Sequence, residues 1–225
     1  MAGASHTATS RKRGVGEKAG LDLDAIVASA RTLPPDQVTM QAVARLLGVD
    51  RSALNHHVKG REHLLQLVAQ ANFSEGFVDI DLPADADWRA ASRAFAWAYA
   101  DALEVVGPLA SHVPDLGEET RFLRAAETVL RRLSAAGFQD EFAVRFLVAL
   151  GYAARGFARD RAEVAAGNEV RRPEHTQVAL DLLGHDAFPH LDRVSRDPFD
   201  TYGKSQLDFV LDVLFEGARA AQLTD

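Results

Sequence analysis

The sequence predicts an all-α protein with a small N-terminal head and a larger C-terminal body. Alanine and leucine are abundant, runs of β-branched residues are scarce, and apolar residues recur at intervals of three and four positions. This spacing is typical of amphipathic helices rather than strands. A chain of 225 residues is long enough to bury a core in one large domain or in two smaller ones.

Residues 1–20 come before the first helical pattern and combine small, polar and charged residues. We predict a disordered basic arm here, because the segment lacks the apolar residues that packing requires. The cluster Arg11-Lys12-Arg13 has two interpretations. It is either a solubilising tail or an arm that follows DNA and becomes ordered on binding.

The first helix is expected from about Asp22 to Thr32, with Pro34-Pro35 ending it. The stretch from Thr39 to Lys59 then predicts two short helices joined by a tight turn. In the first of these, apolar residues follow the helical spacing and Gly48 supplies the C-terminal stop.

The second short helix has an inward and an outward face. Asp50 is expected to cap it, and Ala53, Leu54 and Val58 are expected to face inward. Five polar residues are left to point outward: Arg51, Ser52, Asn55, His56 and His57. A helix–turn–helix needs this division, because one face packs on the scaffold while the other enters the major groove of DNA.

A long helix from about Arg61 to Phe77 should connect the head to the body. Further helices are expected near 88–106, 119–136, 140–164, 174–184 and 201–221, separated by breaks that contain Gly or Pro. The predicted domains are therefore the arm at 1–20, the head at 21–66, and the body at 67–225.

The net charge of −7 is unevenly distributed. Residues 1–61 contain nine Lys or Arg against five Asp or Glu, a balance of +4, so the rest of the chain carries −11. Attraction to phosphate acts over roughly 10 Å at ordinary salt, so a basic head on an acidic body is compatible with DNA binding.

The head resembles the DNA-binding domain of the tetracycline-repressor (TetR) family. The resemblance rests on Val43-Ala44, Leu46-Leu47-Gly48-Val49, Leu54, His57-Val58-Lys59 and Leu64-Leu65. Two features differ from the family pattern: Asn55 replaces the usual Tyr, and Leu33-Pro34-Pro35-Asp36 replaces a Gly-rich link.

In this register, DNA contacts are expected from the outward face of the second short helix, from the start of the helix before it, and from the basic residues that follow it. Arg suits guanine and Asn suits adenine, whereas short polar groups, helix N-termini and Lys suit phosphate. The predicted DNA-binding residues are Thr39, Met40, Gln41, Arg51, Ser52, Ala53, Asn55, His56, His57, Lys59 and Arg61.

The body is similar to the ligand-binding and dimerisation domain of the same family, at Trp88, residues 149–157 and residues 207–214. The resemblance implies a cavity between the long connecting helix and the helices that follow it. Candidate lining residues are Phe77, Phe95, Tyr99, His112, Phe122, Phe146 and Tyr152. The alternative for each aromatic residue is an ordinary place in the core.

No metal, cofactor or catalytic site is expected. His112 is a single possible metal ligand, with Asp160 or Glu163 nearby, and a hard cation prefers several oxygens. A magnesium–tetracycline complex is therefore not expected. The resemblance places Phe77, Phe95 and Tyr152 where the tetracycline-responsive branch has polar groups and a histidine, and these substitutions favour a flatter, more apolar or aromatic effector. The letters Ser111-His112…Asp115 are those of a catalytic triad, but residues on one short segment do not easily reach its geometry.

The leading hypothesis is a ligand-responsive transcriptional repressor that binds a palindromic operator as a homodimer. The last helix should contribute Leu207, Val210, Leu211, Leu214 and Phe215 to a four-helix interface with the 140–164 helix. Two alternatives remain: a helical small-molecule-binding or enzyme domain with a structural head, and a TetR-like activator. The absence of cysteine and of a long apolar segment fits a cytoplasmic protein that does not contact membranes.

Overall fold

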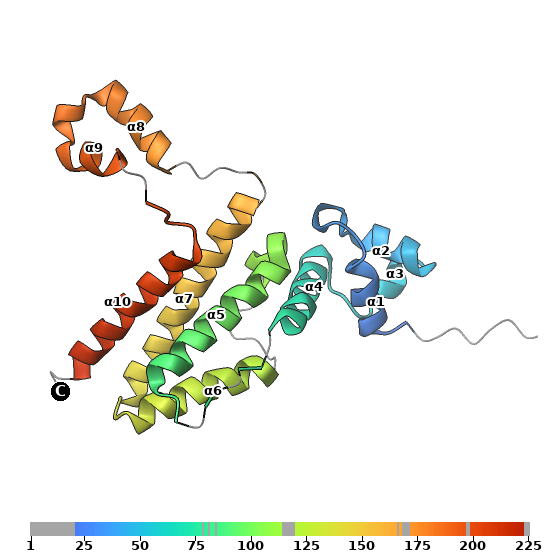
Figure 1. Ribbon diagram of the computed structural model, residues 1–225. Helices are drawn as coiled ribbons and strands as arrows, with labels where there is room; N and C mark the ends of the chain where they lie inside the picture. Colours follow the sequence, from blue (N-terminus) through green and yellow to red (C-terminus); the bar gives the residue numbers. More distant parts are fainter. Residues whose placement is uncertain are drawn as a thin grey trace, which may run out of the picture.

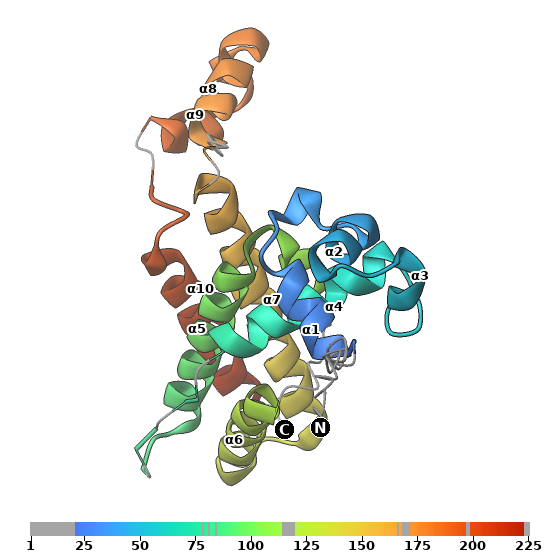
Figure 2. The same ribbon diagram turned by 90° about the vertical axis from the view of Figure 1, so that its right-hand side faces the viewer.

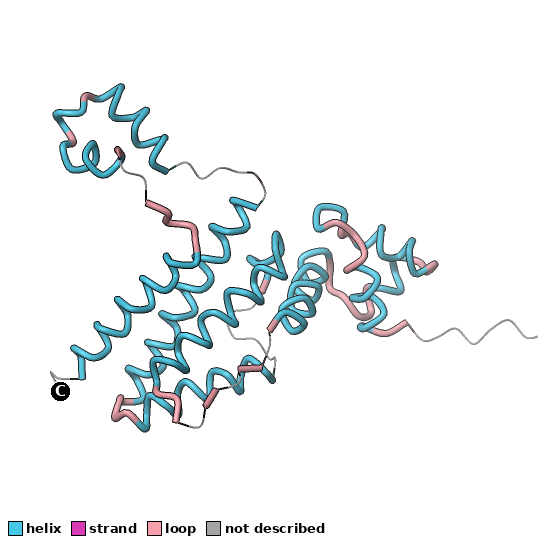
Figure 3. Tube along the Cα trace, viewed as in Figure 1, coloured by secondary structure: helices cyan, strands magenta, loops and turns pink. Residues whose placement is uncertain are grey.

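The computed structural model describes residues 21–77, 79–80, 82–83, 85–113, 120–165, 167, 172–196 and 199–222. All of its regular structure in these residues is helical (Figure 3), which confirms the predicted fold class. A small group of helices at the N-terminal end forms the head, and longer helices form the body (Figure 1). The predicted arm, including Arg11-Lys12-Arg13, lies outside the described residues.

The head contains α1 (Leu23–Ala30), a short 3₁₀ turn η1 (Pro35–Gln37), α2 (Met40–Leu47) and α3 (Arg51–Leu54). The side chain of Asp22 caps α1 by accepting a hydrogen bond from the Ala25 amide at 2.7 Å. A shared core of aliphatic side chains holds these helices against the start of the next one. Its larger fully buried members are Ile26, Val43, Leu54, Val58 and Leu64.

The turn between α2 and α3 depends on Gly48. Its φ of 65° lies in the left-handed region, where it ends α2 with hydrogen bonds from its own amide back to Ala44 and Arg45. Asp50 stands at the N-cap of α3, but its side chain makes no capping hydrogen bond, so the predicted cap is wrong in this respect. The regular part of α3 is one turn long. Turns follow it, in which the amides of Asn55 and His57 donate to the carbonyls of Ser52 and Leu54.

The connecting helix α4 (Arg61–Gly76) begins in the head and ends against the body (Figure 1). At its last residue it crosses α5 (Trp88–Val106) closely, and glycine is required there. A Cβ added at Gly76 would lie 2.9 Å from the Cβ of Val105 and 3.2 Å from the Cα of Ala102. The end of α4 is therefore fixed on α5 at a point where no larger side chain fits.

Helix α5 is the centre of the body and contacts α4, α6 (Thr120–Ala135), α7 (Asp140–Ala165) and α10 (Lys204–Gln222). Its contact with α10 includes a hydrogen-bonded ion pair from Arg93 to Asp208 at 2.6 Å. The indole of Trp97 donates to the same carboxylate at 3.1 Å. Beyond α5 the chain turns at Gly107, which has a φ of 59°, into a second 3₁₀ segment, η2 (Gly107–His112).

Helices α8 (Arg172–Leu183) and α9 (Pro189–Ser195) form a hairpin that extends from the body in both views (Figures 1 and 2). The turn between them contains η3 (His185–Ala187), and His185 contacts Asp181 at 3.0 Å and Asp192 at 2.7 Å. The sequence predicts no helix between 184 and 201, so α9 is a difference from the expectation. Pro189 occupies its first helical position, where the missing N–H of a proline costs nothing.

No helix in the described ranges is both long enough and apolar enough to cross a membrane.

Candidate DNA-reading surface and effector site

The polar side chains of α3 and the turn after it face outward together. Arg51, Ser52, Asn55, His56 and His57 are all exposed. Leu54 and Val58, which alternate with them, are completely buried. The predicted division between an inward and an outward face is therefore present, and we call the five exposed residues the reading surface.

At the start of α2, one side chain caps the helix and the next is buried. The hydroxyl of Thr39 accepts a hydrogen bond from the Ala42 amide at 3.1 Å, so this side chain caps the helix. Met40 is buried in the core, with 4% of its surface exposed, so only its backbone remains for contact with a phosphate. Gln41 is exposed, whereas Ala53 on α3 is half-buried.

Lys59 and Arg61 mark the start of α4. Lys59 is exposed, and its amide donates to Nδ1 of His63 at 3.1 Å. Arg61 donates from Nε to the carbonyl of Val38 at 3.0 Å. This bond joins α4 to the segment that leads into α2, so Arg61 braces the head whatever else its guanidinium contacts.

Four of the predicted effector residues meet in one cluster at the body end of α4. Phe77, Phe95, Tyr99 and Phe122 are buried, and Phe73, which the sequence analysis missed, lies among them. Ring centres are 5.5 Å apart for Phe73 and Tyr99 and 5.6 Å apart for Phe77 and Phe122. We call these five residues the α4 cluster. The spacing of Phe73 and Phe77, one turn apart, could have identified the missing member.

Phe146 lies elsewhere, in a second aromatic group with Trp88 and Phe215. The rings of Phe138, Phe142 and Phe146 stack in series at the start of α7, and Trp88 of α5 and Phe215 of α10 pack against this stack. We call this group the α10 cluster; its members are Trp88, Phe138, Phe142, Phe146 and Phe215.

The other two predicted effector residues are not in either cluster. Tyr152 is 72% exposed on α7. His112, on η2, has its Nε2 atom 3.6 Å from Oε1 of Glu62 in the first turn of α4. Its other ring nitrogen is 3.3 Å from the hydroxyl of the adjacent Ser111. Asp115 lies outside the described residues.

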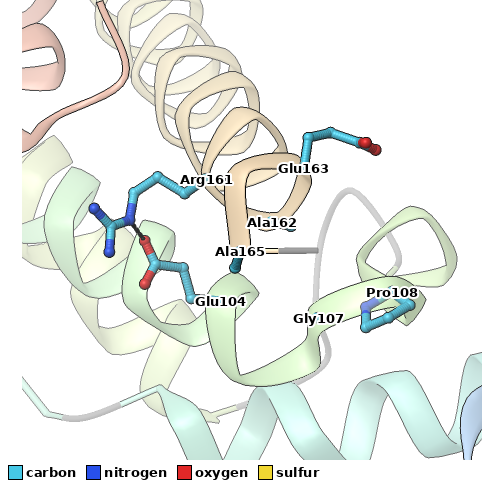
Figure 4. Close-up of a pocket in the computed structure, with 7 residues that line it drawn as sticks. All are labelled: Glu104, Gly107, Pro108, Arg161, Ala162, Glu163 and Ala165. Atoms are coloured by element: carbon cyan, nitrogen blue, oxygen red, sulfur yellow. Dashed lines mark ion pairs between the residues drawn. The ribbon is translucent and has the colours of Figure 1, made fainter. Parts of the chain in front are cut away.

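A groove of about 490 Å³ runs between η2 and the C-terminal half of α7. Pro108, Ala110 and Ser111 line one side, and Tyr152, Arg155 and Gly156 line the other. A second hollow, of about 570 Å³, adjoins it and shares Gly107, Pro108, Ala162 and Glu163 (Figure 4). At the side of this second hollow Arg161 pairs with Glu104 at 2.6 Å.

Arg155 connects the groove to the α4 cluster. It donates a hydrogen bond to the hydroxyl of Tyr99, and its guanidinium carbon lies 5.6 Å from the centre of that ring. Farther along α7, Arg159 and Arg161 contact carboxylates, whereas Arg155 contacts the buried ring of Tyr99. Within the described ranges no group of three or more His, Asp or Glu side chains could hold a metal ion.

Comparison with known families identifies the family of this chain. Residues 82–221, more than half of the chain, match the family model of the tetracyclin repressor-like C-terminal domain. The chain belongs to the TetR family of transcriptional regulators. The membership confirms the resemblance seen in the body sequence, and the head with its reading surface occupies the N-terminal position of the fold. No curated protein matches the chain significantly.

Solved structures of TetR proteins share the fold over most of their length. ActR of Streptomyces coelicolor in complex with actinorhodin is 20% identical with a TM-score of 0.72, over 90% of this chain and 99% of that one. SCO7222 of the same organism is 23% identical with a TM-score of 0.61, over 89% and 99%. A variant of TetR from Acinetobacter baumannii AYE in complex with minocycline is 22% identical with a TM-score of 0.60, over 89% and 94%.

Proposed function

We propose that this TetR-family chain is a repressor that binds a palindromic operator as a homodimer and is released by a small aromatic or apolar effector. The observation that carries the proposal is the position of α4. It begins beside the reading surface, and it ends with Phe73 and Phe77 in the α4 cluster. A change in that cluster therefore acts directly on the helix that supports the head.

Contacts at both ends of α4 support its role as the connection. At the head end, Arg61 bonds to Val38 and Glu62 faces His112 of η2. At the body end, Arg121 of α6 donates to the carbonyl of Phe77 at 3.1 Å. An effector that binds two arrangements of these contacts unequally would shift the head, by no more than its difference in affinity for the two.

The homodimer is supported by an apolar stripe that the protomer leaves uncovered. Phe209 and Val213 on α10 are 62% and 57% exposed, and Val144 and Val148 on the neighbouring α7 are 51% and 42% exposed. An exposed apolar surface of this kind marks an interaction site. The expected interface residues Leu207, Leu211 and Phe215 are buried within the protomer, so the proposed interface uses the opposite side of α10.

The symmetry of a homodimer predicts a symmetric operator. Two reading surfaces separated by about one turn of DNA would recognise two equivalent half-sites, which together form a palindrome. ActR binds actinorhodin and the Acinetobacter variant binds minocycline. Both complexes support a small-molecule effector for the body of this chain.

The proposal is tested by a mobility-shift assay with the DNA that flanks the gene for this chain, at physiological salt. Specific binding that survives competitor DNA is expected, and equal competition by unrelated DNA would reject the operator. Replacing Arg51 with Ala should weaken discrimination at one base pair of each half-site by about 1–3 kcal/mol and leave the dimer intact. A footprint and base preference identical to those of the wild type would contradict base reading by Arg51.

The sign of regulation needs a separate measurement. A strain without the chain should express the adjacent gene at a higher level if the chain is a repressor. Lower expression would favour an activator instead.

A further inference from the structure

We propose that the groove between η2 and α7 binds the anionic group of an aromatic ligand, and that Arg155 is the residue that selects for the negative charge. The inference rests on the proposed function for the regulatory meaning of this ligand, and it narrows the effector to an aromatic acid. The binding site itself is argued from the shape and charge of the groove.

The groove has the size and the surface for a flat ring. Its volume of about 490 Å³ lies within the ordinary range for small-molecule sites. The exposed ring of Tyr152 stands on one wall and Pro108 on the other. Between them, Gly156 leaves open space, because a Cβ added there would meet no heavy atom within 4 Å.

The described residues that line the groove include two cations and one acid. Arg155 and Arg159 lie one turn apart on α7, and Glu163 lies one turn further along. Arg161 leaves α7 on the side opposite Glu163 and pairs with Glu104 (Figure 4). Arg155 is half-buried, and a charge interaction is stronger there than in open water.

Arg155 is held in place before any ligand arrives. Its bond to the Tyr99 hydroxyl and its position over the Tyr99 ring define where the guanidinium lies. Helix α7 packs closely on the same ring, since a Cβ at Gly151 would be 3.5 Å from Cε1 of Tyr99. The planar fork of a guanidinium matches the geometry of a carboxylate, so the position of Arg155 suits recognition of an anion that enters the groove.

The position of Tyr99 gives the site a route to the head. Its ring meets Phe73 of α4 edge to face, with centres 5.5 Å apart. An anion bound to Arg155 would alter the contact of Arg155 with Tyr99, and Tyr99 contacts α4 directly. The residue that recognises the charge is thus two side-chain contacts from the helix that carries the head.

The test compares two probes that differ in charge alone, 2-naphthoate and 2-naphthamide, by calorimetric titration of the full-length chain. The wild type should bind the acid at least about tenfold more tightly than the amide, because hydrogen bonds to a charged group add that much affinity. Arg155→Gln should remove this preference and leave the affinity for the amide unchanged. Arg131→Gln, which removes an exposed cation from α6, is the matched control and should change neither affinity.

Gly156→Leu provides a second test that does not depend on charge. The leucine should fill the groove and abolish binding of both probes, while the melting temperature stays the same or rises, because leucine favours a helix over glycine. Equal affinities of the wild type for the two probes, binding of neither, or a preference that survives Arg155→Gln would each overturn the proposal. So would unchanged binding by Gly156→Leu.

Operator binding is measured separately, with the wild type in the presence and absence of 2-naphthoate. Failure to find any operator would reject the proposed function and leave the probe result intact. Conversely, specific operator binding together with loss of the charge preference in the probes would reject this inference alone.

Discussion

The α4 cluster and the α10 cluster are built from the same kinds of residue, yet their neighbours differ. Phe73 and Phe77 place the first at the end of the helix that leads to the head. The α10 cluster includes Phe215 of the last helix, on the side of α10 that faces away from the proposed dimer surface. Aromatic side chains alone therefore do not identify an effector site; the elements that they join do.

The largest effect that tests this comparison comes from truncating one ring in each cluster. Phe95 and Phe146 are 1% and 5% exposed, so replacing either with Ala should lower the free energy of unfolding by about 3–5 kcal/mol. Chemical denaturation measures this change. The milder replacements Phe95→Leu and Phe146→Leu should separate the clusters, because only the first should alter release from the operator by an effector. An equal change in release for both would remove the functional distinction.

A smaller effect is expected at the point where α4 rests on α5. Gly76→Ala should destabilise the chain by about 1–3 kcal/mol, because the new methyl group would overlap Val105 and force the helices apart. Gly217→Ala is the control, since a Cβ at that helical position meets nothing within 4 Å. It should raise stability by up to about 1 kcal/mol. Thermal unfolding of the two variants compares them, and stabilisation by both would show that α4 tolerates displacement from α5.

The outer side of α10 should affect assembly and leave both clusters intact. Phe209→Asp puts a charge into the uncovered stripe and should weaken dimerisation by about tenfold or more, measured by light scattering over a concentration series. Phe199→Asp changes a similarly exposed ring, 70% exposed, that lies before α10, and should leave the molecular mass unchanged. A dimer of wild-type strength in Phe209→Asp would place the interface elsewhere.

The smallest effect concerns the α8–α9 hairpin and its dependence on pH. A hydrogen bond to Asp192 raises the pKa of His185, and the same bond lowers the pKa of Asp192. The histidine contributes stability that is fully present below its ordinary pKa of 6.5 and is lost as the pH rises through its raised pKa. The aspartate contributes stability that is present above its ordinary pKa of 3.8 and is lost as the pH falls through its lowered pKa.

The hairpin should therefore exchange its amide hydrogens most slowly between these two ordinary pKa values, after correction for the intrinsic effect of pH. His185→Gln should remove the loss of protection at higher pH. Amide protection in the two aromatic clusters should not change with pH in the same way as protection in the hairpin. A parallel loss of protection in the clusters would show that the hairpin is coupled to the body.

The sequence by itself determined the helical fold, most helix boundaries and the two faces of the head. The expected helices at 88–106 and 140–164 appear as Trp88–Val106 and Asp140–Ala165. Local signals were sufficient there, because helical periodicity and Gly48 act within a few residues. The same short range explains why the outward face from Arg51 to His57 was predictable. Pro189 did not predict α9, because a proline marks either a break or a helix start and the surrounding residues do not distinguish the two.

Only the tertiary structure decided which distant side chains meet. Phe95, Tyr99 and Phe146 have similar sequence environments, yet α5 and α7 cross so that Phe146 is directed to α10 and Tyr99 to α4. The contact of Arg155 with Tyr99 joins residues 56 positions apart, and no local pattern records it. Periodicity specifies which face of a helix is buried; the angle and depth at which helices pack specify what that face touches.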